Sequence, residues 1–257
     1  MKRVDFENHF YDISTIDGMA KRETFPKYDR ERDVIHWNNK VEMPQGPLLK
    51  RLLDVGEGRL QLMDAYKIDT AIISTAQGVE DLAPIESIDL CRKTNDAVYA
   101  LTQEYPGRYL GSAILPVKDV KAADAELERC VKELGFVGWH THSNYAGAAP
   151  FEDRFRPLFK KATELGVFVY LHPGFPEEDK LHDFGFTFGG PAAGFTVDTM
   201  LSILKMIVSG LFDELPNLKV VLGHLGEAIP FLLDRIDNRM NFLPNPALKN
   251  QRKPSYY

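Results

Sequence analysis

The first residues that could do chemistry are a carboxylate and an imidazole near the N-terminus. Glu7 and His9 are one residue apart in the run 4–10, VDFENHF, which reads as a short strand. Side chains at positions i and i+2 of a strand point to the same face, so these two could converge on one ion. An E-x-H pair is weak evidence by itself, and two polar residues at a strand end are the alternative interpretation.

Two later strand-like runs also end in histidine: 167–172 at His172, directly before Pro173, and 219–224 at His224. In a parallel barrel the carboxyl ends of the strands share one mouth, where such folds keep their catalytic groups. Glu7, His9 and His172 would form a mixed oxygen and nitrogen donor set, typical of a catalytic metal site with open positions. The carboxylate hardens the set, so Mn²⁺ or Mg²⁺ competes with Zn²⁺ as the expected cation.

A second candidate pair follows the last of these runs. Gly226 permits a tight turn after His224, and we expect Glu227 to open the next helix, where a carboxylate suits the positive end of the helix dipole. Glu227 could then accept a hydrogen bond from the imidazole. Such a pair can move a proton or polarise a substrate oxygen. A plain N-cap beside a core histidine is the alternative.

Other polar residues are candidates with more than one interpretation. His140 and His142 share a face of the fourth predicted strand; we expect His142, nearer the mouth, to contact substrate and His140 to be hydrogen-bonded in the core. Arg235 could meet an anionic substrate or form a salt bridge with a neighbouring acid. For His36 and His182 we expect solvated loop positions.

The elements that must position these residues alternate along the chain. Strands are predicted at 4–10, 70–74, 109–115, 136–142, 167–172 and 219–224, and helices at 57–66, 84–104, 120–134, 153–165, 195–215 and 227–242. This alternation predicts an α/β fold with a parallel sheet and right-handed crossovers. A closed TIM (β/α)8-type barrel needs eight units. Six units therefore predict such a barrel, C-terminally truncated.

Length and composition favour a single barrel domain over 1–257, since the 257 residues are 44% hydrophobic and can bury a sizeable core. The stretch 11–55 is rich in charge and turn formers. Because it follows the strand that carries Glu7 and His9, we expect an irregular, lid-like insertion over the mouth. A second loop, rich in glycine and phenylalanine, is predicted at 173–194.

The remaining composition excludes several classes of protein. A net charge of −6, with no basic stripe, argues against nucleic acid as a partner. Cys91 and Cys130 lie inside helical patterns without a C-x-x-C neighbour, so we expect buried thiols. No run approaches the roughly 20 apolar residues of a membrane span, and the N-terminus enters a strand without a signal-peptide core. These features favour a cytoplasmic protein with no membrane partner.

Five segments together resemble a known family. They are the opening run 4–10, Leu171-His172-Pro173, the segment 209–216, the signature LGHLGE at 222–227, and Arg235-Ile236-Asp237. The chain is similar to the amidohydrolase-related decarboxylases, and within them most similar to the γ-resorcylate (2,6-dihydroxybenzoate) and aminocarboxymuconate-semialdehyde decarboxylases. The resemblance covers nearly the whole chain and is loosest in the insertion. It implies a metal-dependent, non-oxidative carboxy-lyase of hydroxylated aromatic acids.

The resemblance also implies roles for particular residues. Its metal ligands match Glu7, His9 and His172, which would hold one divalent ion, Zn²⁺ or Mn²⁺ or else Mg²⁺. Its hydrogen-bonded active-site pair matches His224 and Glu227. An arginine that lies near the substrate in the family matches Arg235. His142 stands where relatives carry an asparagine that faces the substrate, and this departure leaves the exact substrate open.

Relatives of this kind continue beyond the segment matching 252–257 into two more strands, one of which supplies an aspartate that completes the metal site. The resemblance therefore implies a truncated chain with impaired activity and exposed edge strands, which carry an aggregation hazard. Expected partners are a small aromatic carboxylate and, for the intact enzyme, further copies in a dimer or tetramer. The alternatives are a metal-dependent hydrolase, such as a lactonase, and a non-catalytic remnant.

Overall fold

The computed structural model describes residues 1–76, 78–79, 82–240 and 242–257. It contains two compact units, Met1–His140 (unit 1) and Thr141–Tyr257 (unit 2). The boundary falls inside strand β7 (Gly138–His142), so this strand contributes residues to both units.

The sheet of unit 1 contains β1 (Val4–Phe10), β5 (Thr70–Thr75), β6 (Tyr109–Ala113) and the start of β7, as parallel neighbours in that order. Every residue of β5 is buried, as expected for a parallel strand covered on both faces. The register of β1 against β5 shifts between Asp5 and Asn8, which marks a β-bulge. These strands confirm the first four predicted at the sequence level.

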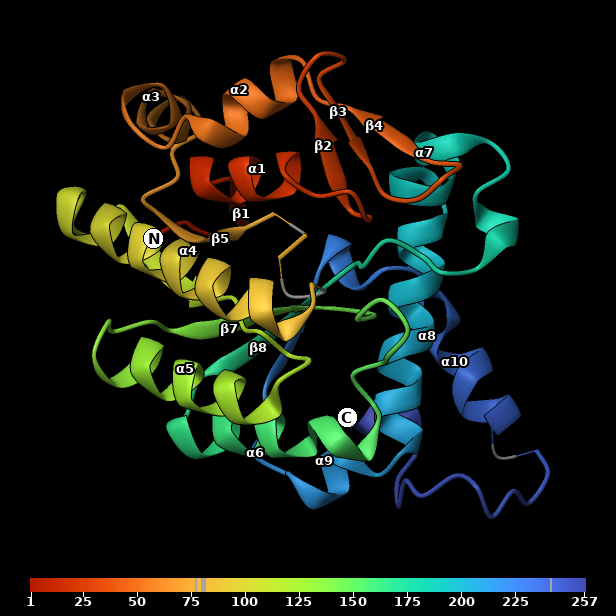
Figure 1. The fold of residues 1–257 in the computed structure, drawn as a ribbon. Coiled ribbons are helices and arrows are strands. Elements are labelled where there is room, and N and C mark those ends of the chain that lie inside the picture. Colours follow the sequence, from red (N-terminus) through yellow and green to blue (C-terminus); the bar gives the residue numbers. More distant parts are fainter. Residues whose placement is uncertain (77, 80–81, 241) are drawn as a thin grey trace. The chain divides into compact units, whose positions relative to one another are not determined.

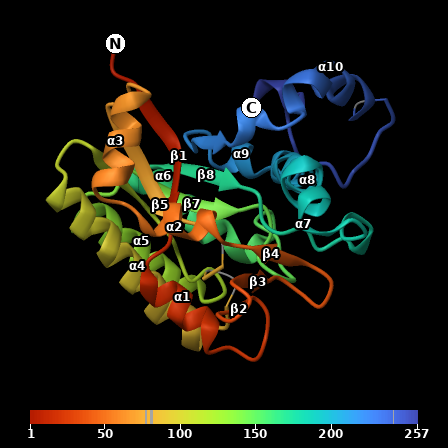
Figure 2. The same ribbon diagram turned by 90° about the horizontal axis from the view of Figure 1, so that it is seen from above.

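Two helices of unit 1, α4 (Pro84–Glu104) and α5 (Val120–Lys132), lie beside each other along one face of its strands (Figure 2). The α5 helix begins at an N-cap, Asp119, whose carboxylate accepts a hydrogen bond from the Ala122 amide. Cys91 and Cys130 are both buried and reduced, as predicted. Burial raises the pKa of the Cys130 thiol far above its ordinary value, and nearby Glu126 adds to this increase, so this thiol is inert at neutral pH.

The insertion at 11–55 is ordered, which corrects the prediction of an irregular stretch. It contains α1 (Ile13–Ala20), a three-stranded antiparallel sheet of β2 (Lys27–Asp29), β3 (Val34–His36) and β4 (Glu42–Pro44), and helix α2 (Pro47–Leu53) (Figure 1). The turn formers seen in the sequence separate short strands instead of marking disorder. Apolar residues here form a hydrophobic cluster, which includes Tyr11, Ile16, Met19, Ile35 and Leu49.

The interpretation of His36 as a solvated residue is also wrong. It ends β3 in a cross-strand pair with Glu42, its side chain is only 15% exposed, and its Nδ1 lies 3.4 Å from the Glu42 carboxylate. Polar side chains that face each other across an antiparallel pair of strands stabilise it. His36 therefore serves the small sheet of the insertion.

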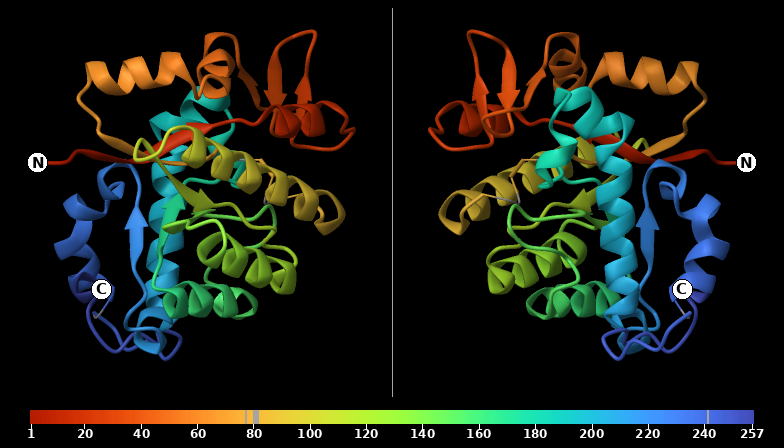
Figure 3. Two further views of the ribbon diagram at one scale, coloured as in Figure 1. Left: turned by 90° about the vertical axis from the view of Figure 1, so that its left-hand side faces the viewer. Right: turned by 90° about the vertical axis from the view of Figure 1, so that its right-hand side faces the viewer.

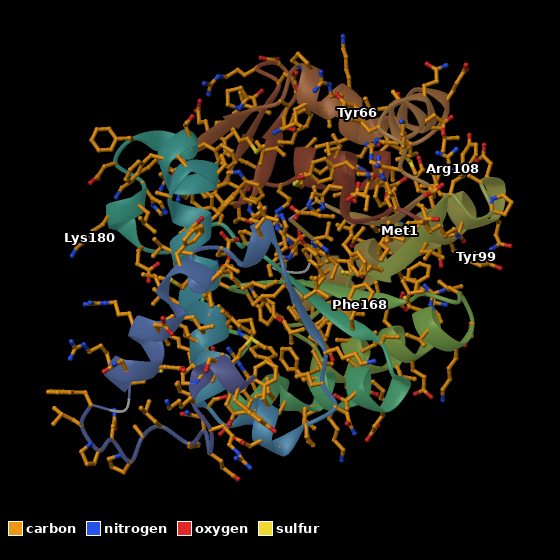
Figure 4. All side chains as sticks on the ribbon, turned by 180° about the vertical axis from the view of Figure 1, so that it is seen from behind. Met1, Tyr66, Tyr99, Arg108, Phe168 and Lys180 are labelled. Atoms are coloured by element: carbon orange, nitrogen blue, oxygen red, sulfur yellow. The ribbon has the colours of Figure 1, made fainter. Side chains whose placement is uncertain are left out.

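Helix α3 (Glu57–Ala65) follows, where a helix was predicted, but its apolar face is mostly exposed. Met63 is buried, whereas Leu62 and Tyr66 are 54% and 68% exposed. Near the end of this helix Arg108 donates to the Asp64 carboxylate at 2.8 Å and to the Asp69 carbonyl at 3.1 Å (Figure 4 labels Arg108 and Tyr66). Polar contacts, rather than a broad apolar face, thus connect the end of α3 with the amino ends of β5 and β6.

Unit 2 contains the end of β7, then β8 (Phe168–His172) and β9 (Val220–Leu222), again as parallel neighbours. Helix α6 (Arg156–Leu165) follows a 3-10 turn, η1 (Asp153–Phe155), and ends at Gly166, whose φ of 73° is the left-handed C-cap predicted for it. The long helix α8 (Gly194–Val208), upright in Figure 3, is followed by α9 (Leu211–Glu214). The last helix, α10 (Ile229–Met240), is followed by a 3-10 turn, η5 (Pro254–Tyr256).

The predicted loop 173–194 contains short helical turns, η2 (Asp179–Leu181), α7 (Gly185–Thr187) and a π-helical turn, η3 (Phe188–Ala192). His182, expected in solvent because of its charged neighbours, is only 6% exposed. Its ring stacks on Phe175 at 5.1 Å, and its Nε2 donates to the Pro176 carbonyl at 2.7 Å. Aromatic stacking and one hydrogen bond therefore bury a side chain that the local charge pattern placed outside.

Among the described residues no single helix has the length and apolar composition of a membrane span, although one bent pair, Gly185–Ala192 with Gly194–Val208, meets those two criteria.

Candidate active site

The two candidate ligands on β1 converge, as their spacing predicted. The Nε2 atom of His9 lies 3.4 Å from the Glu7 carboxylate, and both side chains are partly buried. The bulge between Asp5 and Asn8, which contains Glu7, is fixed by Asp5, whose carboxylate accepts from the Glu7 amide at 3.1 Å and from the Asn8 side chain at 2.9 Å. The strand end is therefore irregular, yet it presents an oxygen and a nitrogen donor side by side.

A cation from helix α3 holds the end of β1 in place. The half-buried Arg59 guanidinium donates to the Asn8 side-chain oxygen at 2.5 Å, to the His9 carbonyl at 3.0 Å and to the Arg51 carbonyl at 2.5 Å. Burial lowers the pKa of Arg59. Sequence reasoning missed this residue, because the helical pattern gives no sign of which charged side chain turns toward the strand.

His140 belongs to the same unit and is 3% exposed, which agrees with the buried position predicted for it. Its ring lies edge-on to that of His9, with 5.3 Å between centroids. Unit 1 thus brings together Glu7, His9 and His140, a carboxylate and two imidazoles, at the carboxyl ends of β1 and of its part of β7.

Unit 2 gathers three further histidines from three strand ends. His142 is fully buried, and its ring lies edge-on to that of His172 with 5.3 Å between centroids. His172 ends β8, opposite the end marked by Phe168 in Figure 4, and its ring centroid is 5.5 Å from that of His224. The predicted convergence of His142, His172 and His224 is therefore present within this unit.

The hydrogen bond of His172 identifies its basic nitrogen. Its Nδ1 lies 2.9 Å from the Pro173 carbonyl oxygen. Since a carbonyl can only accept, Nδ1 carries the proton, and Nε2 keeps the lone pair that a metal ion would use. Ligating histidines commonly have their other nitrogen oriented by a backbone carbonyl in this way.

His224 and Glu227 form the predicted pair, with 2.7 Å between Nδ1 and the carboxylate. The Glu227 side chain is 1% exposed and the His224 side chain 39%. The turn between them is more strained than predicted: His224, Leu225, Gly226 and Glu227 all have positive φ, between 47° and 81°. Three non-glycine residues in this region cost energy and are concentrated at functional sites in proteins.

The prediction that Glu227 opens a helix is wrong, because α10 begins at Ile229. The carboxylate is held by the left-handed turn and by its own burial, so the helix-dipole argument does not apply to it. Arg235 is exposed on α10 and, within the described part of the chain, forms no salt bridge with a neighbouring acid. Its contact with a substrate stays a prediction.

The donors in each unit suit a divalent cation. Carboxylate oxygen with imidazole nitrogen is a set found for Zn²⁺, Mn²⁺ and iron, and imidazole alone suits Zn²⁺. Glu7 and His9 could supply such donors from unit 1, and His142 and His172 from unit 2, where their ligand atoms lie within 4.8 Å of each other. A proton-handling pair, His224 and Glu227, lies beside His172 in unit 2.

Parallel α/β strands that carry histidine and glutamate at their carboxyl ends define a class, the metal-dependent enzymes of barrel type. Comparison with known families agrees. The model of the amidohydrolase family matches residues 4–244, so the chain belongs to this family. The fold is accordingly that of a TIM-type barrel, represented in the described residues by the six predicted strands.

Similar proteins of this family are decarboxylases. The chain is 38% identical over 212 residues to the gamma-resorcylate decarboxylase of Rhodococcus jostii (strain RHA1), a match that covers 77% of this chain and 64% of that enzyme. A crystal structure of 2,6-dihydroxybenzoate decarboxylase complexed with 2,6-dihydroxybenzoate matches with a TM-score of 0.83 and 30% identity, over 100% of this chain and 78% of that one.

A third relative was crystallised with a metal ion. The dihydroxybenzoic acid decarboxylase of Polaromonas sp. JS666, with bound manganese and the inhibitor 2-nitroresorcinol, matches with a TM-score of 0.80 and 30% identity, over 98% of this chain and 74% of that one. The chain spans 64% of the length of the curated gamma-resorcylate decarboxylase from Rhodococcus jostii.

Proposed function

We propose that this chain carries the metal-binding core of a non-oxidative decarboxylase of hydroxylated aromatic acids. In this proposal Glu7, His9 and His172 bind one divalent cation, Mn²⁺ or Zn²⁺. Their donor atoms, their positions at the carboxyl ends of β1 and β8, and membership of a family with manganese-containing decarboxylases support it. The observation that carries the proposal is the His224–Glu227 pair at 2.7 Å, which decarboxylation with ring protonation can use.

The cation would supply Lewis-acid chemistry, neutralising charge on the substrate carboxylate and a neighbouring hydroxyl. Glu227 accepts a hydrogen bond from the Nδ1–H group of His224, which orients the imidazole. His224 could therefore hold or pass on a proton near the ring, while His142 and Arg235 contact the substrate. A proton adds to the ring carbon that bears the carboxylate, the bond to the carboxylate breaks, and its electron pair restores aromaticity as carbon dioxide leaves.

The wider setting belongs to the same proposal. The substrate is a small aromatic carboxylate, like the 2,6-dihydroxybenzoate bound by the structural relative, and the ordered insertion at 11–55 acts as a lid of a single barrel domain. The net charge of −6 agrees with a protein that binds neither nucleic acid nor membrane. We place the enzyme in the cytoplasm as a homodimer or homotetramer.

Metal binding is the direct test of this proposal. Titration calorimetry with Mn²⁺ should give one site per wild-type chain, and His172→Ala or Glu7→Gln should weaken binding about 10-fold or more, since each removes a ligand. His36→Ala is the matched control, because this histidine belongs to the small antiparallel sheet. Equal affinities of wild type and His172→Ala would reject the metal assignment.

Product analysis on the same proteins tests the reaction. Mn²⁺-loaded wild type should release carbon dioxide from 2,6-dihydroxybenzoate faster than His172→Ala does. A metal-dependent hydrolase would instead turn over lactones without releasing carbon dioxide, and that result would replace decarboxylation with hydrolysis. Binding of Mn²⁺ with neither activity would agree with a chain that holds the cation but is impaired in turnover.

A further inference from the structure

The backbone that follows His172 is held by two polar side chains at the end of β7. The Ser143 amide donates to the His172 carbonyl at 2.8 Å, and the Ser143 hydroxyl accepts from the Gly174 amide at 2.7 Å. The side-chain amide of Asn144 donates to the Phe175 carbonyl at 3.0 Å. Backbone groups of His172, Gly174 and Phe175 are thus bonded to Ser143 or Asn144 within unit 2.

Both side chains converge on a single carboxylate. The hydroxyl of Ser143 and the Asn144 side-chain amide, at 3.0 Å, donate to the same oxygen of Asp198 on helix α8. Ser143 is 3% exposed and Asn144 8%, so water does not compete freely for these bonds. Sequence reasoning missed Asp198, because the pattern that predicts a helix at 195–215 gives no sign of which polar side chain on it will meet the end of another strand.

The number of protons available fixes the direction of every bond. An ionised carboxylate can only accept, so the one hydroxyl proton of Ser143 goes to Asp198, and the Ser143 oxygen accepts from the Gly174 N–H. The Asn144 amide has two, one for the Phe175 carbonyl and one for Asp198. The acceptor on α8 therefore orients both donors toward the turn.

The packing of this turn leaves little freedom. A Cβ atom added at Gly174 would lie 2.5 Å from the Asn144 side-chain nitrogen, closer than real Cβ contacts. The backbone at Gly174 therefore packs closely against the Asn144 side chain. His172 itself donates to the Pro173 carbonyl within the same turn, so the ring orientation depends on where that backbone lies.

We propose that Asp198 is a positioning residue for His172, acting through Ser143 and Asn144 on the backbone that sets the imidazole. The proposal rests on the function proposed above, in which His172 is a metal ligand. Outer partners that orient a ligand typically change metal affinity 10–100-fold when they are removed. Asp198 neither contacts the cation nor reacts; it fixes the ligand from a distance of two hydrogen bonds.

The experiment compares Mn²⁺ affinity, measured by calorimetry, in four proteins. Wild type should bind one ion. Asp198→Ala should bind it about 10–100-fold more weakly, and Asp198→Asn should recover most of the affinity, because its carbonyl oxygen can accept from both Ser143 and Asn144. Leu201→Ala is the control: Leu201 lies on α8 and lines the same cavity of about 200 Å³ as Asp198, but its side chain has no charge and no group that could hydrogen-bond to the turn.

A spectrum separates positioning from loss of stability. The Mn²⁺ electron paramagnetic resonance signal of the bound ion should change in Asp198→Ala and stay like that of wild type in Asp198→Asn and Leu201→Ala. If Asp198→Ala does not fold, Ser143→Ala interrupts the same path and should give the weaker binding and the altered signal.

The outcomes distinguish this inference from the function on which it rests. No Mn²⁺ binding by wild type would overturn the proposed function, and the role of Asp198 with it. The positioning role alone would be overturned if wild type binds Mn²⁺ and Asp198→Ala has the same affinity and spectrum as wild type. If Asp198→Ala does not fold, the same result for Ser143→Ala would overturn it.

Discussion

The two strand ends that carry the candidate ligands are held by groups of opposite charge. In unit 1 the Arg59 cation donates to the end of β1, at Asn8 and the His9 carbonyl. In unit 2 the Asp198 carboxylate accepts from Ser143 and Asn144, which bond the turn after β8. Both supports come from a helix far along the chain from the ligand they serve.

The difference follows from what each backbone leaves to be bonded. The end of β1 offers oxygen atoms, a side-chain amide oxygen and a carbonyl, so a rigid fork of donors suits it. The turn after β8 presents both an amide and carbonyls, which need a donor and an acceptor together, and small polar side chains meet this need. The Asp198 carboxylate accepts hydrogen bonds from Ser143 and Asn144 and so sets the orientation of both donors. The charge of the supporting side chain therefore depends on which backbone and side-chain groups beside the metal ligand still need a hydrogen-bond partner.

Loss of the cationic support should have the largest effect on stability. Arg59→Ala removes three charge-assisted hydrogen bonds, and we expect the free energy of unfolding to fall by about 2–3 kcal/mol in urea titrations. Mn²⁺ affinity should fall as well. Arg59→Lys keeps the charge but loses the forked set of donors, so its free energy of unfolding should lie between those of wild type and Arg59→Ala.

The control for Arg59 is Arg108→Ala in the same unit. Arg108 bonds Asp64 and the Asp69 carbonyl at the amino ends of the strands, so this variant should lose stability without changing Mn²⁺ affinity. If both arginine variants lowered the affinity equally, Arg59 would act only through the overall stability of unit 1.

Crowding in the acidic support predicts a smaller effect. Gly174→Ala places a methyl group 2.5 Å from the Asn144 side chain and should cost about 1–3 kcal/mol of unfolding free energy. In an Asn144→Ala background the clash is absent, so the cost of the second substitution should largely disappear. A double-mutant cycle measures this coupling, and strict additivity of the two changes would show that the turn relaxes without strain.

The smallest expected effect is a dependence of stability on pH that arises from the acidic support in unit 2. Burial raises the pKa of Asp198, against the hydrogen bonds of Ser143 and Asn144, and the charges of Glu178 and Glu177 add to the increase. A carboxyl that binds its proton more tightly when folded contributes stability below its unfolded pKa, and this contribution is lost as pH rises through the folded pKa.

The stability of wild type relative to Asp198→Asn should therefore decline as the pH rises from about 4, the ordinary range of an aspartate. Urea titrations of both proteins across the acid range measure this difference. A difference that does not vary with pH, or that grows with it, would contradict the raised pKa.

Much of this arrangement could be predicted from the sequence because it depends on local spacing. The i, i+2 spacing on β1 brought Glu7 and His9 together, and the order of strands placed His172 and His224 at equivalent ends. Burial of both cysteines followed from their helical context. The failures were equally local in origin: charges around His182 suggested solvent, and turn formers at 11–55 suggested an irregular loop, although both segments pack.

The sequence by itself determined the six strands, the chemistry at their ends and the family, since periodicity and residue type act over a few positions of the chain. Only the tertiary structure decided which charged side chains support those ends. Arg59 and Asp198 lie 50 and 26 residues from the ligands His9 and His172 that they serve. Which distant helix supplies the missing donor or acceptor is set by packing, and packing is decided only once the strands and helices have assembled.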